Sequence, residues 1–158
     1  MKALSIRQPW CQRILFEGKD VENRSWPTAY RGPVLIHASK SVAELDRDEW
    51  DDYPRGGIVG HAEIVDCVTS VESDWFFGPY GFVLANVRPL PLIPCRGALG
   101  FFTPDIMSTV ARMAVTGDLT EGQGAKVLSM DRVAFRTLCD EAAARLGAFV
   151  AVCEAGGE

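Results

Sequence analysis

The sequence predicts an α+β fold built around one compact, curved sheet. Its 158 residues suit one ordinary domain, and 47% of them are apolar, which is close to the globular average. Strand-like segments follow one another through the first hundred positions without alternating regularly with long helices. That pattern favours an α+β fold over a doubly wound α/β fold.

The first predicted elements are a strand, a short helix and a second strand. A β-type run covers residues 2–6, and the apolar positions from Trp10 onward have helical spacing. Gly18 is expected to end this helix, because glycine readily takes the left-handed conformation of a helix C-cap. Residues 19–26 then alternate as a strand does, and Pro27 closes the segment.

Further strands are predicted before residue 103. They cover residues 34–38, 58–68, 82–87 and, as a short piece, part of 96–102. Pro89 and Pro91 are expected to end the third of these, since proline cannot donate a ladder hydrogen bond. The polar, acidic segment 39–50 is predicted to be a surface helix.

The pattern changes to helical after residue 103. We expect a helix over 104–115, a glycine-containing loop over 117–124, a second helix capped by Ser129 that ends near Leu146, and a final strand over 148–153. The whole chain, 1–158, is then a single domain. Its core is 1–103 plus the final strand, and 104–146 is a helical addition.

Charge and cysteine content limit the classes of function. A net charge of −5, from 16 Lys and Arg against 21 Asp and Glu, disfavours a general coat for polyanions. Residues 1–40 nevertheless hold seven Lys and Arg but three Asp and Glu, so we look for an anionic ligand there.

The remaining composition predicts a reduced, cytoplasmic protein that needs no metal and no cofactor. The five cysteines form no C-x-x-C pair, and only two histidines accompany them. No apolar run approaches the ~20 residues of a membrane helix, so no membrane association is expected. The sequence carries no indication of oligomeric state.

Three charged residues beside Gly18 form the most informative cluster. Lys19 offers a compact positive charge. Arg24 offers a planar guanidinium group, whose N–H donors fit phosphate and whose face stacks on a base. Glu22 can accept a hydrogen bond from an exocyclic amine of a base. A purely structural interpretation, in which Glu22 pairs with Arg24 and nearby tryptophans belong to the core, is equally compatible with these residues.

The same segments resemble the ASCH domain (activating signal cointegrator homology), a member of the PUA-like superfamily of nucleic-acid-binding folds. The family hallmark G-x-K-x-x-E-x-R is matched at Lys19, Glu22 and Arg24, although Glu17 takes the place of its glycine and Gly18 follows. The resemblance covers about residues 2–102 and continues in 55–60, 78–84, 88–90 and 94–97. It implies a PUA-like mixed β-barrel with flanking helices and a cleft beside the first helix where the three charged side chains converge.

The resemblance implies a nucleic-acid-binding module, whose partner is RNA, another single-stranded nucleic acid or a modified nucleoside. Together with base-edge chemistry and with stacking by Trp26 or Tyr80, it yields eight predicted ligand-binding residues: Gln8, Trp10, Lys19, Glu22, Arg24, Trp26, Lys40 and Tyr80.

Two alternatives stay open. Some ASCH relatives are hydrolases, so the chain could be a metal-independent amidohydrolase of a modified nucleoside, or a ribonuclease, with Lys19 and Glu22 as catalytic residues. The amidohydrolase branch has threonine where this chain has Glu22, and Glu63 is our candidate for its third residue. The second alternative is a protein-interaction module in which the charged cluster is structural.

Overall fold

A computed structural model of the chain describes residues 1–42 and 52–155, with the side chains of 42 and 148–155 left undescribed. The chain divides into two compact units, Met1–Asp105 and Ile106–Glu158. The boundary lies within two residues of position 104, where the helical addition was expected to begin. The organisation of the whole chain as a single domain stays a prediction.

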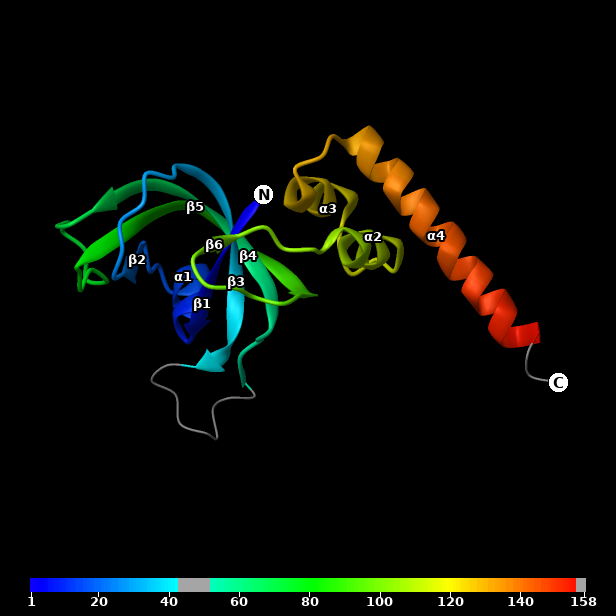
Figure 1. The fold of residues 1–158 in the computed structure, drawn as a ribbon, viewed down its shortest axis with the longest axis horizontal. Coiled ribbons are helices and arrows are strands. Elements are labelled where there is room, and N and C mark those ends of the chain that lie inside the picture. The colour runs from blue at the N-terminus through cyan, green and yellow to red at the C-terminus, as the bar shows by residue number, and fades with distance from the viewer. Residues whose placement is uncertain (43–51, 156–158) are drawn as a thin grey trace. The chain divides into compact units, whose positions relative to one another are not determined.

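The first unit is a half-barrel made of one mixed sheet (Figure 1). Its elements are β1 (Lys2–Gln8), α1 (Trp10–Phe16), β2 (Val21–Arg24), β3 (Gly32–Val42), β4 (Gly57–Val68), β5 (Tyr80–Pro94) and β6 (Phe101–Phe102). The six strands lie in the order β2-β5-β4-β3-β1-β6. β1 and β3 are parallel, and the other neighbouring pairs are antiparallel. The α+β class predicted from the sequence is therefore confirmed.

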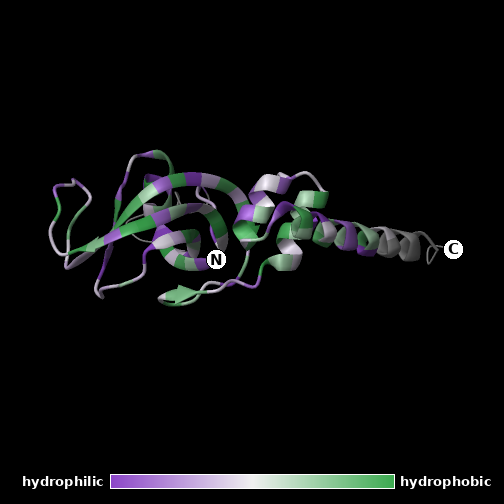
Figure 2. Ribbon diagram, turned by 90° about the horizontal axis from the view of Figure 1, so that it is seen from above, coloured by the Kyte–Doolittle hydropathy of each residue, from purple (hydrophilic) through white to green (hydrophobic). Residues whose placement is uncertain are grey.

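The core of this unit lies where α1 and the inner face of the curved sheet meet. Because successive side chains of a strand point to opposite faces, the strands alternate between apolar and polar positions (Figure 2). Phe82 is fully buried and contacts the ring of Trp26 edge-on, with 5.1 Å between centroids. Trp26 also meets Phe101 at 5.6 Å, so it belongs to the wall of the barrel.

The structure corrects the expected end of β5. The strand was predicted to cover 82–87 and to be ended by Pro89 and Pro91, but it continues to Pro94 and pairs with β4 through Pro89 and Ile93. β2 pairs with β5 only between Tyr80 and Val83. Beyond that point one edge of β5 has no β2 partner, and an edge strand tolerates proline.

The predicted helix over 39–50 is also corrected in part. β3 runs on to Val42, so residues 39–42 are strand. The rest of that predicted helix lies outside the described residues.

The second unit is helical, with α2 (Met107–Val115), α3 (Glu121–Leu128) and α4 (Arg132–Ala155). α3 replaces part of the predicted loop because Thr120 and Gln123 form a capping box at its start. Ser129 is the left-handed C-cap of α3 and not the start of the next helix. In the described part of the chain, no helix is long and apolar enough to cross a membrane.

The predicted final strand over 148–153 is wrong, because α4 continues through it to Ala155. Alanine, which has the highest helix propensity, recurs on both sides of Gly147, at 142–144, 148, 151 and 155, and a glycine inside a helix costs only about 1 kcal/mol. Gly147 therefore does not end α4. The half-barrel takes no strand from these residues.

Candidate functional site

A sharp bend after α1 brings the charged cluster together. The backbone N–H groups of Glu17 and Lys19 both donate to the carbonyl of Arg13, each at 3.0 Å. Gly18 between them has φ of +74°, in the region that favours glycine. The helix stop predicted at Gly18 is confirmed. It also explains why glycine is not needed at position 17, which has an ordinary φ of −119°.

Lys19 is buried between two aromatic rings. Its residue is 2% exposed, and its ammonium group donates to the carbonyl of Val21. The Nζ atom lies 5.4 Å from the ring centroid of Trp10 and 5.6 Å from that of Trp75, within the range of cation–π attraction. Burial lowers the pKa of Lys19, and the nearby carboxylate of Glu22 opposes that shift.

Glu22 and Arg24 form an ion pair on β2, with 3.2 Å between Oε1 and Nη2. Burial raises the pKa of Glu22, while the charges of Arg24 and Lys19 work in the opposite direction. Arg24 Nη2 also donates to the carbonyl of Ser5 at 2.7 Å. Within the described part of the chain, the buried Nε–H of Arg24 has no hydrogen-bond partner. The cluster therefore contains one buried donor without an acceptor in the described protein.

All three residues line one cavity of about 770 Å³, which we call the first cavity. Among the described residues that line it are four cations and one carboxylate, so this lining carries an excess of positive charge. Two apolar side chains at its edge are unusually exposed, Phe77 at 74% and Leu99 at 99%. The lining residues are Ser5, Ile6, Arg7, Trp10, Arg13, Lys19, Glu22, Asn23, Arg24, Ser39, Ser41, Phe77 and Leu99.

Asn23 fixes the aromatic loop at the edge of the first cavity. Its side-chain amide donates to the carbonyl of Trp75 at 2.8 Å, and its Oδ1 accepts from the backbone N–H of Phe77 at 2.9 Å. The Arg13 guanidinium lies 4.6 Å from the ring centroid of Trp10. Sequence reasoning missed Asn23 and Arg13 as site residues, although Asn23 stands inside the charged motif.

The structure divides the eight predicted ligand-binding residues. Trp10, Lys19, Glu22 and Arg24 line the first cavity. The other four do not, and they are Gln8, Trp26, Lys40 and Tyr80.

Each of these four residues has another position in the structure. Both polar groups of Gln8 are used internally, with Nε2 donating to Pro54 O and Oε1 accepting from the backbone of Gln12. Trp26 packs in the core, and Tyr80 is the strand partner of Arg24 in β5. Lys40 lines a neighbouring cavity.

Glu63, the candidate third residue of the hydrolase alternative, does not join Lys19 and Glu22 in the first cavity. It accepts a hydrogen bond from Asn86 at 2.9 Å. Among residues 1–41 and 52–147, no three His, Cys, Asp or Glu side chains group as metal ligands would. What the cavity offers is buried charge, hydrogen-bond donors and aromatic surface.

A half-barrel of this topology with a charged cavity beside its first helix is characteristic of a PUA-like module. The profile of the ASCH domain family matches residues 4–87, which is more than half of the chain. The chain therefore belongs to the ASCH domain family, a family of PUA-like modules associated with RNA binding.

Two relatives extend this comparison. The chain is 30% identical to Activating signal cointegrator 1 of Homo sapiens over 122 residues, which cover 60% of this chain and 20% of that protein. It is 33% identical to Activating signal cointegrator 1 of Mus musculus over 82 residues, or 42% of this chain and 14% of that protein. The chain thus spans a fifth or less of the length of these curated relatives.

Proposed function

We propose that the chain binds single-stranded RNA and seats one unpaired nucleotide in the first cavity. The buried, unpartnered Nε–H of Arg24 carries this proposal, because a buried donor without an acceptor costs about 1–3 kcal/mol that a ligand can recover. The cationic excess of the cavity selects an anionic ligand, and its volume accommodates a nucleotide-sized group.

Each lining residue has a defined role in this proposal. Arg24 and Lys19 stabilise the anionic part of the nucleotide. Glu22 accepts from an exocyclic amine of the base, in the way a carboxylate accepts from the N4 amine of cytosine. Phe77 supplies the stacking surface at the edge, a role first assigned to Trp26 or Tyr80, which do not line the cavity.

A matched pair of arginine variants tests the proposal. We expect Arg13→Gln to weaken binding of a fluorescently labelled single-stranded RNA pentamer about tenfold, because it removes one cation from the cavity. Arg31→Gln makes the same charge change at an exposed ion pair with Asp66 outside the cavity and should stay within about twofold. Fluorescence anisotropy at one salt concentration measures both. Equal affinities for the two variants, or no RNA binding by the unsubstituted protein, contradict the proposal.

The hydrolase alternative is supported by one observation, since burial lowers the pKa of Lys19 and so favours the neutral amine that a general base requires. The same RNA samples, and parallel samples with acetylcytidine, are analysed by chromatography after incubation with EDTA. Recovery of intact RNA and intact acetylcytidine supports a binding module. Turnover that disappears in Lys19→Met and in Glu22→Gln supports an enzyme.

A further inference from the structure

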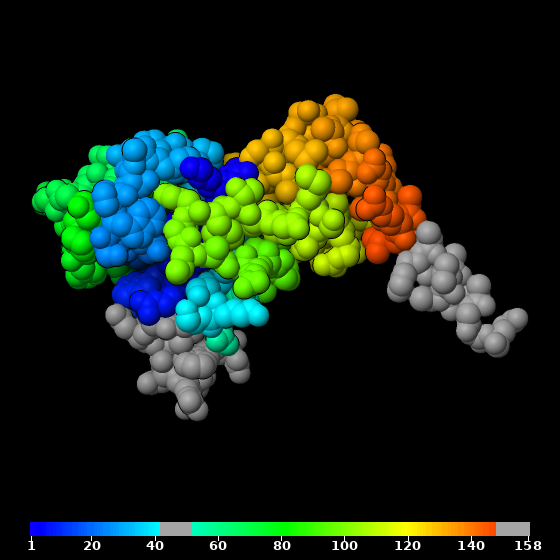
Figure 3. Space-filling view, in the orientation of Figure 1, coloured from blue at the N-terminus to red at the C-terminus, as the bar shows by residue number. Residues whose placement is uncertain are grey.

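A second cavity, of about 790 Å³, adjoins the first. The two share Ser5, Ser39 and Leu99, so they adjoin each other at these residues, and we call the two cavities together the groove. Figure 3 shows the lime-green segment that follows β5 beside the cyan end of β3. The second cavity is lined by Ser5, His37, Ser39, Lys40, Gly56, Pro94, Cys95, Arg96, Gly97, Ala98 and Leu99.

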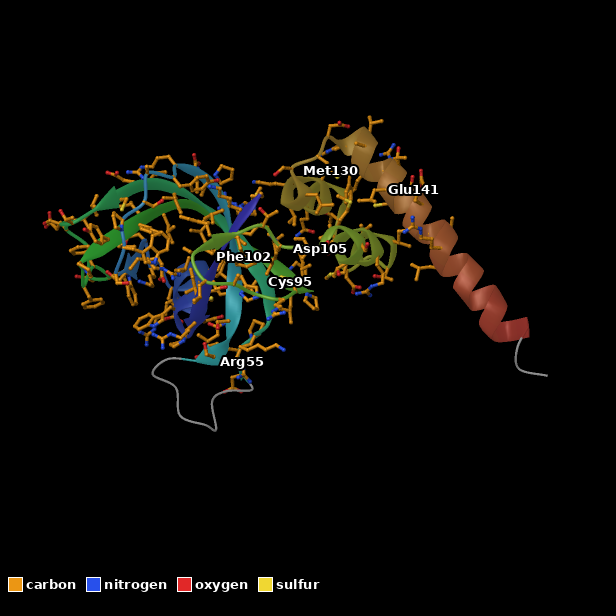
Figure 4. All side chains as sticks on the ribbon, viewed as in Figure 1. Arg55, Cys95, Phe102, Asp105, Met130 and Glu141 are labelled. Carbon is orange, nitrogen blue, oxygen red and sulfur yellow. The ribbon has the colours of Figure 1, made fainter. Side chains whose placement is uncertain are left out.

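The floor of the second cavity is neutral and tightly packed. His37 is 2% exposed and lies between the Ser5 hydroxyl, at 3.1 Å, and the carbonyl of Cys95, at 3.3 Å. Because a carbonyl only accepts, Nε2 carries the proton and Nδ1 accepts from Ser5. Burial lowers the pKa of His37, which keeps the ring uncharged at neutral pH. Figure 4 labels Cys95, which directly follows β5.

Gly97 lets the backbone lie directly on that floor. A Cβ at this position would stand 2.4 Å from His37 Cε1 and 2.9 Å from Ser5 Oγ, so no side chain fits there. In the described part of the chain, the backbone N–H groups of residues 96–99 donate no hydrogen bond. These four residues line the cavity, and their amides have no acceptor in the described protein.

Among the described residues that line the second cavity, the charged ones are Lys40 and Arg96, both cationic. The stem of Lys40 packs on Gly56, where a Cβ would stand 3.2 Å from Lys40 Cε. Gly56 has φ of +77°, which favours glycine and keeps this contact open. The ammonium group is therefore held at the edge of the cavity while the lysine stem stays packed. Two cations with unpartnered amides are the donor set that binds phosphate.

We propose that the second cavity is a phosphate subsite for the nucleotide adjoining the one in the first cavity. The ligand of the groove is then a chain of at least two nucleotides and not a free nucleoside. This inference rests on the proposed function, because it needs a nucleotide in the first cavity.

The test compares two double variants on two probes. Lys40→Gln/Arg96→Gln removes the cations of the second cavity, and Arg31→Gln/Arg88→Gln makes the same change in charge at exposed positions outside both cavities. The probes are cytidine monophosphate and a single-stranded RNA pentamer of cytidines. Calorimetry gives the affinities, and a salt series gives the number of phosphates neutralised.

We expect the first double variant to lose about tenfold or more in affinity for the pentamer and to bind the monophosphate within about twofold of the unsubstituted protein. Its salt slope should fall by about 1.4, the effect of two lost phosphate contacts on a single strand. The control should keep both affinities within about twofold.

Three results overturn the inference. If the pentamer is bound equally by both double variants while Arg13→Gln weakens it, the proposed function stands and the phosphate subsite is wrong. If Lys40→Gln/Arg96→Gln weakens the monophosphate as much as the pentamer, the two cavities hold one and the same nucleotide. If the unsubstituted protein binds neither probe, the proposed function fails, and the subsite fails with it.

Discussion

Replacing Arg24 with methionine is expected to lower the free energy of unfolding by about 3 kcal/mol at pH 8, because the Glu22 carboxylate then stays buried without the cation 3.2 Å away. The methionine fills a similar volume, so the loss reports the missing charge more than a missing side chain. Arg31→Met is the matched control, since Arg31 pairs with Asp66 in an exposed position, and its loss should stay below about 1 kcal/mol.

The loss in Arg24→Met should shrink as the pH falls from 8 to 5. Burial already raises the pKa of Glu22 in the folded protein, and Arg24 opposes that rise, so removing Arg24 raises the pKa further. A carboxyl group whose pKa is higher in the folded than in the unfolded protein stabilises the fold at pH values below its unfolded pKa. This stabilisation is lost as the pH rises through the pKa of the folded state. Acidification therefore protonates Glu22 in the variant and relieves the buried charge.

Urea unfolding at pH 5 and pH 8 measures this effect. Adding Glu22→Gln to Arg24→Met should restore part of the stability at pH 8, because no charge is then buried at position 22. A loss that is the same at both pH values, or that equals the loss in Arg31→Met, contradicts the buried ion pair.

Phe82→Ala is expected to destabilise the first unit by about 3–5 kcal/mol. Phe82 is fully buried, packs against both Trp26 and Phe101, and is the strand partner of Glu22. Its removal leaves a cavity behind the strand that carries the charged cluster.

Phe77→Ala is the same substitution at a side chain that is 74% exposed. It should change stability by no more than about 0.5 kcal/mol, while weakening RNA binding by about 1–3 kcal/mol, the contribution of one aromatic stacking contact. Thermal unfolding and fluorescence anisotropy on the two variants separate the roles. Retained affinity in Phe77→Ala would remove the stacking role from the loop, and comparable loss of stability in both variants would place Phe77 in the core.

Features with a local cause could be predicted from the sequence. The stop at Gly18 depends on one residue's backbone freedom, and the α+β class depends on the order of short strands, so both are confirmed. α4 was misjudged at its end because Gly147 and the apolar residues after it are also typical of a turn and a strand. The length of β5 was misjudged because proline tolerance depends on which edges are paired, and pairing is a property of the whole sheet.

In the candidate site too, residues close together in the chain could be predicted, and residues brought in by the pairing of distant strands could not. Lys19, Glu22 and Arg24 lie close together in the chain, so their convergence on one cavity could be anticipated. Phe77 and Leu99 reach the same cavity only because β5 pairs with β2 and the segment after β5 passes the end of β3. Trp26 was assigned a stacking role from its residue type, but whether an aromatic ring faces the core or a ligand is decided by packing.

The Nε–H signal of Arg24 in a nitrogen–proton correlation spectrum tests most directly whether the charged cluster faces a nucleotide. The group is buried and has no protein acceptor in the described residues, so a ligand acceptor should move its signal strongly. We expect titration of the labelled protein with a single-stranded RNA pentamer to shift this proton downfield and slow its exchange with water, while the Arg31 signal stays in place. An Arg24 signal that does not change while the RNA saturates the protein would show that the nucleotide binds elsewhere.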